Sequence, residues 1–219
     1  MKRNFLINGA AAVLLMAGTL QAEEVIIRPE TPADYGSGAS ARQDFYIPGE
    51  GAKEMFIGHP NRNTRGDRAL IRFNLEPLLL KASLLKKAEI VLYFERMYSQ
   101  DPEESRHIVI ERLLDPVEEL SGATVSSRNA EVVAEYDVKR DDLIFRDNPS
   151  SQARPSDPAR FDITELLKKE LDAGTSTMTI RISDTRAEAE PNDTGAGIGI
   201  TLPVSPETIP QLHVELNNP

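Results

Sequence analysis

The chain has 219 residues, a formal net charge of −10 and no cysteine. The lack of cysteine excludes disulfide bonds, thiolate metal sites and a cysteine nucleophile. A surplus of acidic residues on this scale argues against binding nucleic acid through a general cationic surface.

The first 22 residues have the pattern of a secretory signal peptide. Lys2 and Arg3 precede a mostly apolar stretch over residues 5–20, and Ala22 supplies a small residue at the cleavage point. That stretch is too short to span a bilayer comfortably as a permanent anchor. We therefore expect export to the periplasm or the cell exterior, a mature chain that starts near Glu23, and no membrane insertion after signal removal.

Short segments with the character of β-strands follow one another along residues 23–219, separated by turns rich in glycine and proline. Strands are expected at 24–28, 44–47, 54–57, 68–75, 88–98, 107–114, 131–138, 177–184, 197–202 and 211–216. Many short strands with such turns favour an all-β fold. We expect a single domain over residues 23–219, a β-sandwich of jelly-roll type with one short α-helix.

That helix is predicted at residues 162–173. Asp162 is the expected cap, with Glu165 three residues later completing a capping box. Gly174 is expected to end the helix. The apolar stripe that would face the core consists of Ile163, Leu166, Leu167 and Leu171.

Other stretches have weaker patterns. Residues 89–94 are apolar on both faces, which indicates a central strand that is covered on both sides. Residues 78–85 fit either a helix or an irregular connection. The polar stretches 140–160 and 187–197 are predicted as exposed loops.

The strand at 68–75 alternates strictly between two faces. One face carries Ala69, Ile71, Phe73 and Leu75, and the other carries Arg68, Leu70, Arg72 and Asn74. We expect the first face to be buried and the second to present a cationic row. Because arginine's planar fork binds carboxylates with two parallel hydrogen bonds, this row suits an acidic ligand.

Six basic residues within twenty positions form the candidate ligand-binding set: Lys53, His59, Arg62, Arg65, Arg68 and Arg72. The alternative is a solvated face whose arginines form salt bridges with neighbouring acidic residues. Both interpretations stay open at this stage.

No catalytic residues are predicted, so we do not expect an enzyme. The protease-like triplet Asp193-Thr194-Gly195 has no second copy, and the three histidines lie far apart in the sequence. The G-x-S-x-G signature of serine nucleophiles is absent. No cofactor is expected, although loop carboxylates leave a structural calcium ion open, and other metal ligands stay unknown.

Several segments resemble, in this order, the motifs of the DNRLRE-domain family of secreted bacterial β-sandwich modules: Asp34-Tyr35-Gly36, Arg68–Phe73, Ala88–Phe94, Asp162–Gly174 and Ile209–Val214. Some members of that family bind acidic polysaccharides such as alginate. The resemblance implies a secreted, non-catalytic carbohydrate-binding protein for an acidic polysaccharide. The alternative is a structural or adhesion module of the cell surface that binds another protein.

Overall fold

The structure is a computed structural model. It describes residues 23–29, 35–39, 45–46, 54–59, 67–98, 105–115, 129–144, 157–185, 196–201 and 208–218. The predicted signal peptide and the predicted loop at 187–197, except for its last two residues, lie outside these ranges.

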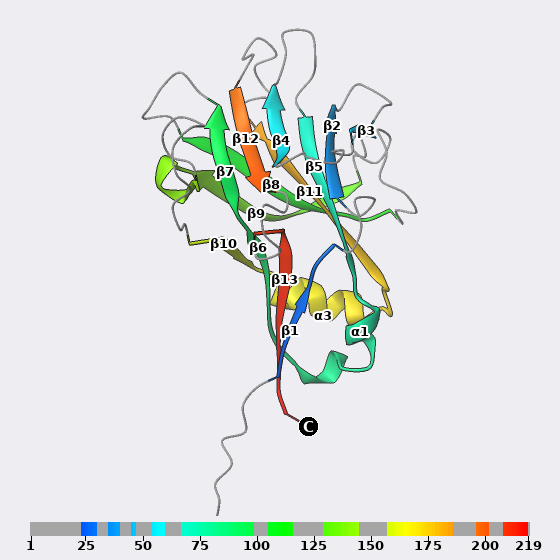
Figure 1. The fold of residues 1–219 in the computed structure, drawn as a ribbon. Helices are drawn as coiled ribbons and strands as arrows, with labels where there is room; N and C mark the ends of the chain where they lie inside the picture. Colours follow the sequence, from blue (N-terminus) through cyan, green and yellow to red (C-terminus); the bar gives the residue numbers. More distant parts are fainter. Residues whose placement is uncertain are drawn as a thin grey trace, which may run out of the picture.

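Strands dominate the described part of the chain (Figure 1). They are β1 (Glu23–Ile27), β2 (Tyr35–Ala39), β3 (Phe45–Tyr46), β4 (Glu54–His59), β5 (Asp67–Asn74), β6 (Leu85–Leu92), β7 (Phe94–Tyr98), β8 (Arg106–Leu113), β9 (Ala130–Val138), β10 (Ala159–Asp162), β11 (Thr177–Asp184), β12 (Ala196–Thr201) and β13 (Gln211–Leu216). The helical elements are α1 (Glu76–Leu79), α3 (Thr164–Asp172) and the 3-10 turns η2 (Ala82–Leu84) and η3 (Arg140–Asp142). Each of the ten predicted strand segments contains a strand.

The strands form two antiparallel sheets. The smaller sheet has the order β1-β13-β6-β10. The larger sheet runs β7-β12-β4-β5-β11-β8-β9, and β2 joins it beside β5 with β3 on its far side. The predicted all-β class with a short helix is therefore confirmed, while the jelly-roll connectivity stays a prediction.

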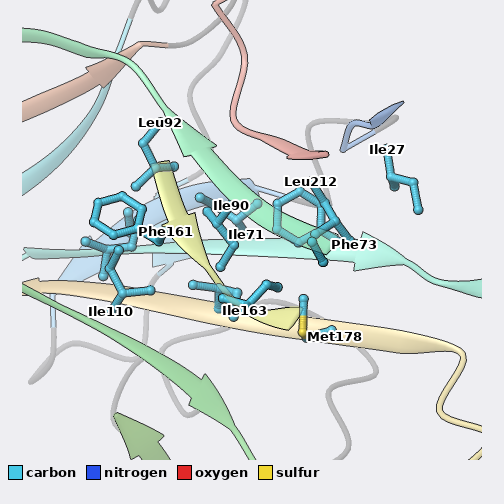
Figure 2. Packing of buried hydrophobic residues seen from close by; sticks show 14 of the residues in the cluster. Ile27, Ile71, Phe73, Ile90, Leu92, Ile110, Phe161, Ile163, Met178 and Leu212 are labelled. Carbon is cyan, nitrogen blue, oxygen red and sulfur yellow. The ribbon is translucent and has the colours of Figure 1, made fainter. Parts of the chain in front are cut away.

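One hydrophobic core joins the two sheets. Figure 2 shows Ile71 and Phe73 of β5 in the same cluster as Ile90 of β6 and Leu212 of β13. The predicted inner face of β5 is confirmed, because all four of its apolar residues are fully buried. Alternation along β5 thus directs its apolar side chains into a core to which strands of both sheets contribute.

The single strand predicted at 88–98 is wrong in one respect, because the chain forms two strands there. β6 pairs within the small sheet and β7 pairs with β12 in the large sheet. Tyr93 lies between the two strands, and the flanking Leu92 and Phe94 are both buried in the core. The apolar run on both faces reflects a segment that leaves one sheet and enters the other.

The predicted loop at 140–160 is also partly wrong. Leu143 is buried and forms a bridge with Phe94, and β10 starts at Ala159. These elements were not predicted from the sequence because each is short and surrounded by polar residues. In the same way, β2 lies within a glycine-rich stretch in which no strand was expected.

Helix α3 follows β10 directly and packs on the core through the predicted stripe, of which Ile163, Leu167 and Leu171 are buried. The predicted capping box is wrong because Ile163 occupies the N-cap position. Asp162 still stabilises the helix start, since its Oδ1 accepts a hydrogen bond from the Thr164 backbone N–H at 2.9 Å. The undecided stretch at 78–85 forms the end of α1 and the turn η2.

The end of α3 is a Schellman motif. The Gly174 N–H donates to the Leu171 carbonyl at 3.0 Å, and the Thr175 N–H donates to the Glu170 carbonyl at 2.9 Å. Gly174 has φ +71°, as the αL position of this motif requires. The prediction that Gly174 ends the helix is confirmed.

Gly174→Ala is expected to lower the free energy of unfolding by about 1 kcal/mol, because a side chain disfavours the αL conformation. No atom lies within 4 Å of the added Cβ, so the cost is conformational and not steric. Urea unfolding measures the change. Gly174→Asn serves as the control and should cost less, since asparagine tolerates αL. Equal stability of Gly174 and Gly174→Ala proteins would contradict this geometry.

His213 should make the stability of the fold fall as the pH drops below about 6.5. Burial, followed by the nearby positive charge of Arg160, lowers the pKa of His213 below its ordinary value of 6.5. The unfolded chain therefore takes up the proton first. The contribution of His213 is complete above pH 6.5 and is lost as the pH falls toward the folded pKa.

The measurement is the midpoint of urea unfolding against pH for the native chain and for His213→Gln. We expect a shallower decline in the variant over this range. Parallel curves for the two proteins would contradict the role of His213.

Candidate functional site

The structure places only part of the predicted ligand-binding set. Lys53, Arg62 and Arg65 lie outside the described residues. His59 is the last residue of β4, where its backbone pairs with Ala196 of β12. The remaining two, Arg68 and Arg72, both lie on β5. The site is therefore built from β5 and the strands beside it.

Arg68 and Arg72 lie on the face of β5 that points away from the core, and both are half-buried. Leu70 lies between them and is 0% exposed. The cationic row therefore stays a prediction, with the buried Leu70 interrupting it. The outer face of β5 carries the two arginines beside a covered apolar residue, so their charges act in a partly desolvated setting.

A third arginine comes from the neighbouring strand. In the antiparallel pairing of β5 with β11, Arg181 lies opposite Leu70 and Thr179 lies opposite Arg72. Arg181 is only 5% exposed. Its position is therefore midway between Arg68 and Arg72 along the sheet. The alternation of residues 177–184 indicated that Arg181 points away from the core. The strand register that places Arg181 between Arg68 and Arg72 could not be predicted from the sequence.

Arg181 is held by a carboxylate. Its Nε donates to Glu111 Oε2 at 2.8 Å, and Glu111 lies opposite it on β8. This ion pair is a cross-strand contact in a sheet whose outer face is covered here. The sequence had left salt bridges with neighbouring acids open as an alternative, and this arginine follows that alternative.

Two further arginine–carboxylate pairs lie toward the inner side of the large sheet. Arg106 of β8 donates through Nε to Asp184 Oδ2 at 2.7 Å, and both side chains are completely buried. Arg112 of β8 donates to Glu170 Oε2 of α3 at 2.6 Å. These pairs tie β8 to β11 and to the helix, so they are structural partners.

The outer face becomes acidic at the opposite side of the large sheet. Glu135 and Asp137 of β9 have side chains that are 60% and 61% exposed. His107 lies between them, with its Nδ1 at 2.8 Å from Asp137 Oδ1 and its Nε2 at 3.6 Å from Glu135 Oε2. Charge on this face thus changes from basic at β5, through the neutralised Arg181–Glu111 pair, to acidic at β9.

A groove of about 730 Å³ separates β9 from the start of α3 and from β6. Its lining includes Lys87, Val132, Val133, Asp162, Thr164 and Leu166. Hydrogen bonds from Thr164 lower the pKa of Asp162, and the bond to Glu89 raises the pKa of Lys87. These polar groups are satisfied within the protein. The described members of the predicted set, His59, Arg68 and Arg72, do not line the groove.

Within the described ranges, no group of three or more His, Asp or Glu side chains is arranged to hold a metal ion. In the same part of the chain, no helix has the length and apolar character needed to cross a membrane. The described arginine–carboxylate pairs join neighbouring strands, or β8 and helix α3.

Comparison of the sequence with protein-family models found no match, and comparison with curated proteins found no similar sequence. The resemblance to the DNRLRE-domain family therefore stays a hypothesis that rests on the order of the motifs.

Removing one partner of the inner Arg112–Glu170 pair should destabilise the fold. The two side chains are 15% and 3% exposed, so Glu170→Ala leaves a largely buried guanidinium without its carboxylate. We expect a loss of about 3 kcal/mol in the free energy of unfolding, measured by urea denaturation.

The double variant Arg112→Met/Glu170→Leu should recover most of this loss, because it removes both charges. The exposed pair formed by Arg160 and Glu89 is the control, and Arg160→Ala should cost less than about 1 kcal/mol. A loss for Glu170→Ala as small as that of the control would show that the inner pair is not structural.

Proposed function

We propose that the chain is a secreted, non-catalytic carbohydrate-binding protein that recognises an acidic polysaccharide. The observation that carries this proposal is the placement of Arg68 and Arg72 on the outer face of β5. Four residues separate them, which is roughly 13 Å along a strand at about 3.3 Å per residue. That spacing suits carboxylates on successive units of an extended uronate chain.

The environment of these arginines supports the proposal. Both are half-buried, and a guanidinium interacts with a carboxylate more strongly where water is partly excluded. Arg181, the third arginine of this region, is only 5% exposed and donates to Glu111. We assign the ligand to the more exposed Arg68 and Arg72, and we assign to Arg181 the role of keeping the underlying sheet in register. Lys53, His59, Arg62 and Arg65 remain proposed contributors from the chain that precedes β5.

We also propose the jelly-roll sandwich as the scaffold of this site. Two antiparallel sheets that contribute to one core support this arrangement. Export fits the same account. β1 begins at Glu23, so cleavage after Ala22 would leave intact the pairing of β1 with β13.

Arg68→Ala and Arg72→Ala should each weaken binding to alginate by roughly 1–3 kcal/mol, the contribution of a hydrogen bond to a charged group. Arg→Lys should also weaken binding, because an ammonium cannot reproduce the fork. The affinity should fall as salt is added. Affinity electrophoresis and isothermal titration calorimetry measure these changes.

Arg160→Ala is the matched control, since it removes the same charge from β10, an exposed position away from β5. It should bind like the native chain. Normal binding by folded Arg68→Ala and Arg72→Ala proteins would move the site elsewhere, and unfolding of both would make these arginines structural.

A screen against alginate, pectin and neutral glucans separates the proposal from its alternative. Retardation by the two acidic polysaccharides is the expected result. Retardation by none of the glycans would favour a structural or adhesion module, and new reducing ends would reveal an enzyme.

A further inference from the structure

β9 is an edge of the large sheet. It ends the strand order and pairs with β8 on one side only, and no described strand pairs with its other side. In an antiparallel strand, every second residue directs its N–H and C=O away from the neighbour that it pairs with. At nine residues, β9 therefore offers a long row of backbone donors and acceptors, which is a template for another strand.

The strand is held firmly from within. The ring of Tyr136 stacks on Phe94 with centroids 6.2 Å apart, and its edge meets Phe161 at 5.6 Å. Val138 is fully buried at the end of β9. These contacts fix β9 against both sheets, so the edge that no described strand pairs with is held in a defined position.

The exposed carboxylates of β9 favour a partner strand with basic side chains. Glu135 and Asp137 occupy alternate positions, opposite Val109 and His107 of β8, so they share the outer face of the sheet. A strand added beside β9 would place two of its own alternate side chains across from them. Lysine or arginine at those two positions would form cross-strand pairs with the carboxylates.

An apolar position extends the pattern. Val132 is 55% exposed, which is unusual for a valine in a sheet, and it borders the groove of about 730 Å³. Val133 and Leu166 line the same groove. An incoming strand therefore finds apolar contacts at the Val132 end of β9 and acidic contacts at the Asp137 end.

We propose that β9 binds an extended, basic segment of a partner protein, which adds a strand to the edge of the large sheet. The segment has basic residues at two alternate positions and an apolar residue toward the Val132 end. β11 and β8 separate this edge from Arg68 and Arg72 on β5, so the edge adds a second ligand to the proposed function.

A second copy of this chain is a poor occupant of the same edge. Pairing β9 with β9 would bring the acidic side chains of two copies together, and opposed like charges destabilise a sheet. Exposed charge on an edge strand is a known device against self-association. The acidic edge thus disfavours the protein itself and favours a basic strand.

The test uses two nine-residue peptides and the mature chain. In one peptide, lysine alternates with threonine and valine; in the other, the same residues are reordered so that the lysines are adjacent. Isothermal titration calorimetry gives the affinities, and amide hydrogen exchange locates the contact. We expect the alternating peptide to bind at least about tenfold more tightly and to protect amides of β9.

Charge reversal provides the second arm. Glu135→Lys/Asp137→Lys should lower affinity for the alternating peptide by roughly tenfold or more. The control Glu24→Lys/Glu76→Lys changes the net charge equally at exposed positions of β1 and α1, and should alter affinity less than about threefold. Circular dichroism checks that both variants fold. If either variant fails to fold, the comparison of the two peptides on the native chain still tests the proposal.

Three outcomes would overturn the proposal. They are equal binding of the two peptides, protection of amides outside β9, and no binding of the alternating peptide up to about 1 mM. Equal binding would indicate a general attraction between the acidic protein and cationic chains. Dimerisation of the native chain with protection of β9 would assign the edge to a second copy instead.

Discussion

The pairing of charged side chains across β11 is the interaction on which the rest of the structure depends. Seven of the eight residues of this strand are buried, so the strand is covered on both faces. A buried arginine or aspartate needs a partner of opposite charge at hydrogen-bonding distance, because removing one partner leaves a desolvated charge. Arg181 forms an ion pair with Glu111, and Asp184 forms one with Arg106. Both partners lie on β8. A shift of one residue would exchange the faces of the strand and separate both pairs.

The outer face of the same sheet carries charged side chains of both signs. Arg68 and Arg72 lie on β5, and the exposed Glu135 and Asp137 lie on β9. The net charge of −10 is compatible with the proposed acidic ligand at β5, since exposed charges farther apart than about 8 Å are largely screened at physiological salt. In the two proposals made above, one sheet would serve two ligands of opposite charge, a polysaccharide on its face and a basic strand at its edge.

The local hydrophobic pattern of the sequence was sufficient to predict part of this fold. The alternation of residues 68–75 predicted the buried face of β5, and the stripe of residues 163–171 predicted how α3 packs. Pairing between distant strands was not readable, because register depends on contacts that a single sequence does not display. The role of Arg181 and the burial of Leu70 both follow from that register. β2 and β10 were not predicted because glycine and polar residues obscure their alternation. The break at Tyr93 was not predicted because an unbroken apolar run has the pattern of a single strand.

A double-mutant cycle on Arg181 and Glu111 tests the central claim most directly. Urea unfolding of the native chain, Arg181→Ala, Glu111→Ala and the double variant gives the coupling free energy between the two side chains. The side chains are 6% and 18% exposed, so we predict a favourable coupling of about 1–3 kcal/mol, with each single variant less stable than the native chain. A coupling free energy near zero would contradict the account, because the pair would then not hold β11 in its register with β8 and β5.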